Sequence, residues 1–256
     1  MWTFRGRLTD CLLLSYRTPA ESVRELVPAG LQLITRGPWA FWNVVACRVE
    51  QVRPEGVPQW AGLSYHHVAY RLLTRCVTAE TDFVDGLYFV RSEADHSFVT
   101  AMGRHVTDFK FRPASIAVGP EGFEVSRDGV AGSRVMLGEP VPAVEVAATW
   151  PADSCFPTLK DAQEFLRYRP VSMAPDGRGR ARLAEVSRDD AAWRERVVNV
   201  VDQRMGLFDE LGQSEATLEL ATAVDPIEYQ WKLGRTVDLL GYRQVPAPQR
   251  VAESVA

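Results

Sequence analysis

Two stretches of the chain place apolar and polar side chains with a period of two, which predicts β-strands. In the first, over residues 39–50, one face carries Phe41, Asn43, Val45 and Cys47. In the second, over residues 64–76, one face carries Tyr65, His67, Ala69 and Arg71. Successive side chains of a strand point to opposite faces, so His66, Val68, Tyr70 and Leu72 form the other face of this strand. Each strand therefore presents polar groups within an otherwise apolar face.

Further strands are predicted where shorter apolar runs occur, over residues 10–16, 87–91, 180–185, 216–224 and 227–233. Residues 107–150 are predicted to be antiparallel strands with turns at residues 119–122 and at Asp128-Gly129. The runs 216–224 and 227–233 are predicted to form a closing strand pair bent at Asp225-Pro226. Residues 190–201 stay ambiguous between helix and strand.

Helices are predicted at three places. Residues 19–27 follow Thr18, which we expect to cap the helix, with Pro19 in its first turn. A second helix begins after Thr158 and has Asp161 in the capping-box position. A short helix is expected over residues 93–102, with Phe98, Val99 and Met102 on its apolar side.

Antiparallel strands with two or three short helices predict an α+β fold. With 46% hydrophobic and 24% charged residues, the chain has the composition of a globular domain. Nothing in it resembles an interdomain linker, so we expect one domain over residues 1–245 and a flexible tail over residues 246–256.

Charge and motif content restrict the partners. The net charge of −4 argues against nucleic acid or an anionic membrane as a partner. The four cysteines show no CxxC spacing and are expected to be reduced core residues. Neither a metal-ligand spacing nor a phosphate-binding glycine motif is present, so we expect no metal and no cofactor. Without a leader peptide or an apolar run of about 18 residues, the chain is expected to be cytoplasmic, with a small-molecule partner; whether it is a homo-oligomer stays open.

Residues 103–114 read Gly-Arg-His-Val-Thr-Asp-Phe-Lys-Phe-Arg-Pro-Ala. This stretch resembles the strand of the acetoacetate decarboxylase-like superfamily that carries a Schiff-base lysine. Other pieces fall in the order of that superfamily, namely Tyr16-Arg17-Thr18, Gly62-Leu63-Ser64-Tyr65, Gly86-Leu87-Tyr88 and Asp95. The chain is most similar to the YqjF-like branch, over about residues 11–116. The resemblance implies a strongly curved antiparallel sheet that forms a cone or open barrel around a cavity.

The resemblance also implies where this chain departs from the decarboxylases. Aligning Gly103-Arg104 puts Phe111 at the position of the nucleophilic lysine. It puts His67 at the position of a pocket glutamate and Asn43 near a second one. The implied catalytic residues are His67, Asn43 and Arg112. The implied substrate-binding residues are Tyr65, Arg71, Phe111, Phe109 and Phe41.

These candidates have definite chemistry. An imidazole titrates near neutral pH, so His67 can transfer a proton, and the guanidinium of Arg71 can hold a carboxylate. A structural core histidine would fit the same pattern. Lys110 is one residue from the expected nucleophile position and so belongs on the opposite strand face, unless a bulge re-aims it.

Two functions follow as hypotheses. The first is an enzyme that lacks the Schiff-base lysine and acts on a carbonyl- or carboxylate-bearing substrate by acid–base chemistry, such as dehydration, aldol-type reaction or cyclisation. The second is a non-catalytic protein that binds an apolar or acidic ligand in the same cavity. Convergence of His67, Asn43 and an arginine in one enclosed pocket would favour the enzyme.

Overall fold

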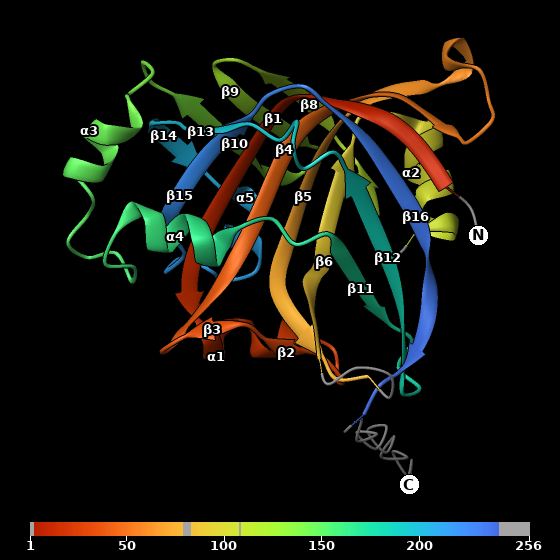
Figure 1. Cartoon of the computed structure of the whole chain (residues 1–256), viewed down its shortest axis with the longest axis horizontal. Helices are drawn as coiled ribbons and strands as arrows, with labels where there is room; N and C mark the ends of the chain where they lie inside the picture. The colour runs from red at the N-terminus through yellow and green to blue at the C-terminus, as the bar shows by residue number, and fades with distance from the viewer. Residues whose placement is uncertain (1–2, 79–82, 108, 241–256) are drawn as a thin grey trace, which may run out of the picture.

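The computed structural model describes residues 3–78, 83–107 and 109–240. Its centre is a closed barrel of seven strands (Figure 1). In order around the barrel these are β1 (Thr3–Pro19), β4 (Trp39–Pro54), β5 (Leu63–Cys76), β6 (Val84–Ala94), β11 (Val171–Pro175), β12 (Arg180–Arg188) and β16 (Ile227–Asp238). All neighbours pair antiparallel except β6 and β11, and β16 closes the barrel on β1. The predicted α+β fold, with a curved sheet in the form of a barrel, is confirmed.

Two strands pair with different parts of one edge of β1. β16 pairs with residues Thr3 to Leu8, and β15 (Thr217–Val224) pairs with residues Cys11 to Arg17. The predicted closing pair of 216–224 and 227–233 is therefore wrong in its pairing, because both strands bond to β1 instead of to each other. β13 (Glu195–Val197) extends the sheet beyond β15. The short strands β2 (Gln32–Leu33), β3 (Thr35–Arg36) and β7 (Phe111–Pro113) join β5, β4 and β6 respectively.

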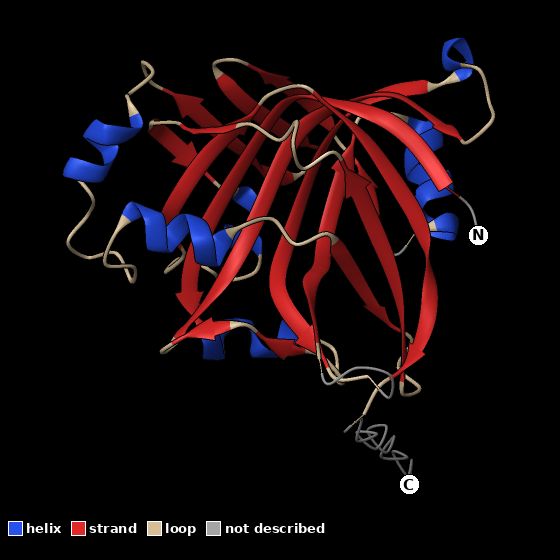
Figure 2. Ribbon diagram, viewed as in Figure 1, coloured by secondary structure: helices blue, strands red, loops and turns tan. Residues whose placement is uncertain are grey.

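A second sheet covers part of the outer face of the barrel (Figure 2). It contains β8 (Ser115–Gly119), β9 (Gly122–Arg127), β10 (Val130–Leu137) and β14 (Val200–Arg204). The predicted turns at 119–122 and 128–129 are confirmed between its strands. The expectation that residues 107–150 are all antiparallel strands is wrong, because β7 runs parallel to β6 and residues 143–148 are helical.

Two apolar cores result from this arrangement. Phe41, Val45, Cys47 and Ala69 point into the barrel, whereas Trp42, Val44, Val68 and Tyr70 pack outward against the second sheet. The predicted division of faces in β4 and β5 is confirmed. Both faces of these central strands are buried, which explains why their sequences are apolar almost throughout.

The helices are short. They are α1 (Ala20–Val23), which continues as the 3-10 helix η1 (Arg24–Leu26), then α2 (Ser97–Val106), α3 (Ala143–Ala148), α4 (Leu159–Leu166) and α5 (Gly206–Glu210); a second 3-10 helix is η2 (Gln59–Ala61). No helix in the described ranges has both the length and the apolar character needed to cross a membrane. The helix expected over 93–102 begins only at Ser97, because β6 extends to Ala94. Its predicted apolar side is wrong: Phe98 and Met102 are 56% and 44% exposed, and the helix buries Thr100 and Gly103.

The two predicted caps have different outcomes. The Thr158 side chain accepts a hydrogen bond from the Asp161 amide at 3.2 Å, so the cap of α4 is confirmed. Thr18 does not cap α1, whose N-cap is Pro19. The Thr18 hydroxyl is fully buried and donates to Gln213 Oε1 at 3.0 Å, a tertiary partner that a local pattern cannot reveal.

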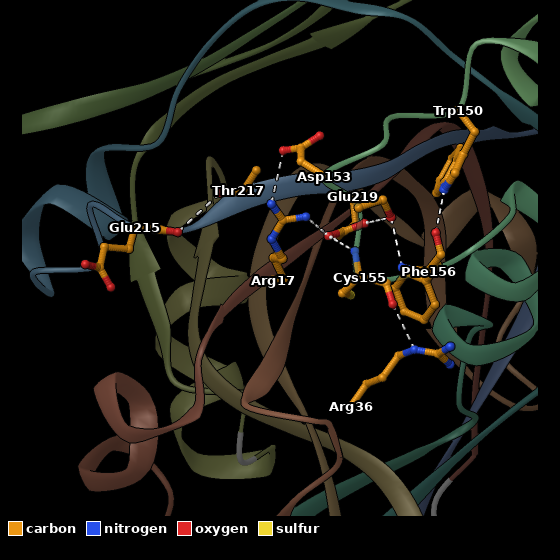
Figure 3. Close-up of polar contacts among 10 residues, drawn as sticks. Arg17, Arg36, Trp150, Asp153, Cys155, Phe156, Glu215, Thr217 and Glu219 are labelled. Atoms are coloured by element: carbon orange, nitrogen blue, oxygen red, sulfur yellow. Dashed lines mark hydrogen bonds and ion pairs between the residues drawn. The ribbon is translucent and has the colours of Figure 1, made fainter.

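The buried carboxylate of Glu219 holds the segment between α3 and α4 against β15 and β1 (Figure 3). Glu219 on β15 forms an ion pair with Arg17 and accepts hydrogen bonds from Ser154 Oγ at 2.5 Å and from the Cys155 amide at 3.3 Å. This holds Phe156 in the barrel core, where its ring contacts Phe41. The segment and α4 thereby cover the barrel interior.

Candidate functional site

A cavity of about 60 Å³ lies inside the barrel. All seven barrel strands line it, and the segment that joins α4 to β11 adds Tyr168 and Arg169. The apolar lining is Leu8, Leu13, Val45, Val49, Leu87, Phe89, Phe109, Val171, Val186 and Trp231. The polar lining is Cys11, Cys47, His67, Arg71, Tyr168, Arg169, Ser172 and Tyr229. Among the described residues no carboxylate lines the cavity, so its charged groups are cationic.

Arg71 is the charged centre of the cavity. It projects from β5 and is only 5% exposed. Its Nη2 donates to the Asn43 side-chain oxygen and its Nε to the Asn43 carbonyl at 3.4 Å. Its guanidinium lies 5.6 Å from the ring centroid of Phe89 and 5.9 Å from that of Tyr168. Within the described parts of the chain no ion pair joins Arg71 to an acid. A buried cation without a counter-charge is costly, so this position favours an anionic ligand.

His67 lies on the same strand and the same face as Arg71. Its Nε2 is buried and has no hydrogen-bond partner among the described residues. Burial, and then the charge of Arg71, lower the pKa of His67 to about 3. The imidazole is therefore neutral near pH 7, and its buried nitrogen can exchange a hydrogen bond or a proton with a bound molecule.

The sequence did not predict a pair of hydroxyl groups in the cavity, those of Tyr168 and Tyr229. Tyr229 on β16 donates a hydrogen bond to the hydroxyl of Tyr168. Arg188 lies over the Tyr168 ring at 4.6 Å and over the Trp193 ring at 3.4 Å. Tyr168 and Trp193 lie outside regular strands and helices, so no periodic pattern could have placed them.

The structure brings only some of the predicted residues together. Asn43 holds Arg71, and Phe109 lines the cavity with its ring stacked on Phe89 at 4.3 Å. Phe111 is buried behind His67, with ring centroids 5.1 Å apart. Tyr65 lies 6.1 Å from His67 between ring centroids.

Five of the predicted residues do not line the cavity: Asn43, Tyr65 and Phe111, which lie beside Arg71 or His67, and also Phe41 and Arg112. Phe41 packs against Phe156 and Phe165 in the barrel core. Arg112 is exposed, beside Glu93 in the β6–β7 register. We therefore do not carry Arg112 forward as a group of the site.

Lys110 does not enter the cavity, even though its backbone has the left-handed φ of 54°. Its ammonium group donates to the hydroxyl of Tyr88 and lies 4.3 Å from the centroid of that ring. Tyr88 belongs to the apolar cluster around Met173 and Leu183 and does not line the cavity. The Lys110 ammonium is thus directed away from His67 and Arg71.

No group of three or more His, Cys, Asp or Glu side chains suited to a metal ion occurs in the described residues. His66 lies on the other face of β5, where its Nδ1 is 2.7 Å from Asp95 Oδ2. The side chain of His105 is outside the described part of the chain.

Solved structures with the same fold belong to acetoacetate decarboxylase-like proteins. An acetoacetate decarboxylase-like enzyme from Sphingomonas wittichii RW1 is similar with a TM-score of 0.56 and 15% identity, over 93% of this chain and 94% of that one. The enduracididine biosynthesis enzyme MppR complexed with pyruvate has a TM-score of 0.54 and 15% identity, over 94% and 90%. Acetoacetate decarboxylase from Legionella pneumophila has a TM-score of 0.54 and 11% identity, over 93% and 88%. At these identities the likeness shows the fold.

Sequence comparison gives a family. No curated protein matches the chain. Residues 5–225 match the family described as an uncharacterized conserved protein, DUF2071, which is the YqjF-like group. The match covers most of the chain, and the chain therefore belongs to the DUF2071 family.

Proposed function

We propose that this protein is an enzyme that acts on a small organic acid inside the barrel, by acid–base chemistry and without a Schiff-base lysine. One observation carries the proposal: the buried guanidinium of Arg71 has no acidic partner among the described residues and shares its cavity with the unpartnered nitrogen of His67. An incoming carboxylate would supply the missing charge to Arg71. The substrate would then lie beside a group that can take up a proton.

The positions of Phe111 and Lys110 support the proposal that this enzyme has no imine-forming lysine. In the alignment on Gly103-Arg104, the nucleophile position falls on Phe111, a buried ring that packs on His67. The neighbouring Lys110 bonds to Tyr88 outside the cavity. The described residues that line the cavity therefore include no amine for covalent catalysis.

The remaining groups suit dehydration, aldol-type or cyclisation chemistry, because each of these moves protons and develops charge on an oxygen. His67 would transfer the proton, and Arg71, oriented by Asn43, would hold the acid and stabilise negative charge. The related fold of MppR is reported with pyruvate and with the condensation product of pyruvate and imidazole 4-carboxaldehyde. Pyruvate is accordingly a reasonable first probe for this chain.

An isotope-exchange experiment tests the proposal. Pyruvate is incubated with the protein in D₂O, and loss of the methyl proton signal is followed by NMR. We expect faster exchange than in buffer, slowed by His67→Gln and by Arg71→Gln and unchanged by His66→Gln, whose side chain lies on the other face of β5. Exchange at the buffer rate, or an unaffected His67→Gln variant, would contradict the assignment of His67.

A second function is favoured by a different observation. Among the described residues no carboxylate base lines the cavity, and the pKa of His67 is only about 3, which makes the empty site a weak base. These features fit a protein that binds an acidic or apolar ligand without converting it. Native mass spectrometry of the freshly purified protein distinguishes the enzyme from the binding protein. A binding protein would retain a ligand and leave it unchanged on prolonged incubation, whereas an enzyme would convert it. Neither function depends on the expected cytoplasmic location or on whether the chain forms a homo-oligomer.

A further inference from the structure

The hydroxyl pair of Tyr168 and Tyr229 is a second polar group of the cavity. Tyr229 projects from β16, whereas Tyr168 comes from the segment that follows α4. Their rings meet edge to face, with centroids 6.5 Å apart and an interplanar angle of 63°. Two different parts of the chain thus fix one hydroxyl group against the other.

The direction of this hydrogen bond leaves one proton available. Tyr229 donates and Tyr168 accepts, so the hydroxyl proton of Tyr168 is not used in the pair. The Tyr168 hydroxyl donates no hydrogen bond to another of the described residues. A partly buried hydroxyl proton of this kind is available to water or to an acceptor atom of a bound ligand.

Two guanidinium groups flank Tyr168. Arg71 lies 5.9 Å and Arg188 4.6 Å from the centroid of its ring. Burial raises the pKa of the Tyr168 hydroxyl, and the charges of Arg71 and Arg188 partly oppose that rise. Tyr168 therefore stays protonated near neutral pH, and its electropositive surroundings strengthen it as a hydrogen-bond donor toward an oxygen that carries negative charge.

We propose that Tyr168, held in place by Tyr229, determines specificity by donating a hydrogen bond to a second oxygen of the ligand whose carboxylate is held by Arg71. The ligand class is then a small acid that carries a carbonyl or hydroxyl oxygen close to its carboxylate, since Tyr168 and Arg71 are near neighbours. This inference rests on the proposed function, because it takes Arg71 as the carboxylate site. It adds Tyr168 to the site and predicts a preference for acids that carry this second oxygen.

The test compares two acids of equal carbon number, pyruvate and propionate, which differ in the keto oxygen. Their dissociation constants are measured by titration calorimetry for the wild type, Tyr168→Phe and Tyr229→Phe. Tyr16→Phe serves as the matched control, because the Tyr16 hydroxyl bonds to Gln203 between the two sheets and not in the cavity. Tyr168→Phe keeps the ring that lies against Arg188 and Trp193.

The expected result is that the wild type binds pyruvate about fivefold or more tightly than propionate. Tyr168→Phe should bring the ratio close to one without weakening propionate, Tyr229→Phe should lower the ratio partly, and Tyr16→Phe should leave it unchanged. An unchanged ratio in Tyr168→Phe, or a wild-type ratio of one, overturns this inference and leaves the proposed function standing. If Tyr168→Phe binds neither acid, this inference is also overturned, because Tyr168 then has a structural role. A wild type that binds neither acid overturns the proposed function and this inference together.

Discussion

The chemistry of this barrel depends on two side chains of β5, a cation and a neutral imidazole placed on one face. Arg71 and His67 have few polar partners, and both line the cavity. Burial disfavours the charged form of His67, whereas an anion held by Arg71 would favour it. Binding and protonation are therefore expected to be coupled.

The first prediction concerns that coupling. In the empty protein the pKa of His67 is about 3, and a bound carboxylate raises it, so binding of an acid takes up protons. Affinity should then increase as the pH falls toward the pKa of the complex. Titration calorimetry with pyruvate in buffers of different ionisation enthalpy measures the uptake directly. His67→Gln should abolish it, and His66→Gln should preserve it; identical proton uptake in both variants would make His67 a structural residue.

The second prediction concerns Lys110. Its ammonium group bonds to Tyr88, which is not among the described residues that line the cavity. Incubation with acetoacetate and borohydride should therefore give no stable adduct in intact-mass measurements. An adduct that maps to Lys110 in peptide digests would restore the Schiff-base mechanism and would place this amine in the cavity.

At the residue scale the sequence placed His67 and Arg71 on one strand face, because strand periodicity is a local property. It could not identify the Arg71–Asn43 contact, which depends on the register of β4 against β5. The place of Tyr168 in the cavity could not be predicted from the sequence, because it depends on how the segment after α4 crosses the barrel. Local patterns report which face a side chain occupies, and tertiary structure decides what it meets there.

At the scale of elements, α2 and β7 are connected by a close contact between a glycine and an aromatic ring. A Cβ atom at Gly103 would overlap the ring of Phe111, which is buried against His67 and Phe109. The helix can therefore approach β7 only with glycine at this position.

The third prediction follows from this contact. Gly103→Ala should lower the free energy of unfolding by about 1–3 kcal/mol through overpacking, although alanine has the better helix propensity. Chemical denaturation provides the measurement. Gly119→Ala is the control, since a Cβ there meets nothing within 4 Å, and it should change stability little. Equal stability of the two variants would show that the Phe111 ring is free to move.

Elements were predicted best where the signal was local. Thr158 caps α4 as expected because both partners of the cap lie within three residues. Thr18 fits the same local rule but bonds to Gln213, 195 residues away. The apolar pattern of Phe98 and Met102 indicated a buried face, yet the barrel leaves that side of α2 exposed. The separate pairing of β15 and β16 with β1 is likewise a property of barrel closure.

At the scale of the whole molecule, the barrel and the outer sheet are joined by ionic groups as well as by apolar packing. Glu210 on α5 accepts hydrogen bonds from Arg91 on β6, with both N···O distances 2.6 Å, and from Arg127 on β9 at 3.1 Å. These bonds, chiefly those from Arg91, lower the pKa of Glu210 to about 2. Acid should therefore affect the cavity and the sheet interface in different pH ranges.

The fourth prediction concerns acid stability. His67 has a lower pKa in the folded chain than its ordinary value of 6.5, so the unfolded chain binds the proton first, and stability is lost as the pH falls from about 6.5 toward 3. Glu210 contributes a loss between its ordinary 4.5 and about 2. Denaturation at a series of pH values should show that His67→Gln flattens the upper range and Glu210→Gln the lower. If the wild type and His67→Gln show the same pH dependence of the free energy of unfolding above pH 4.5, the imidazole is hydrated.

The central claim is that Arg71 is the anion site of the barrel, and the affinity of pyruvate for Arg71→Gln tests it most directly. Arg112→Gln is the control, because it removes an exposed guanidinium that lies outside the cavity lining. Loss of a charge-assisted hydrogen bond predicts affinity at least about tenfold weaker for Arg71→Gln in titration calorimetry, with Arg112→Gln unchanged. Wild-type affinity in Arg71→Gln would contradict the claim.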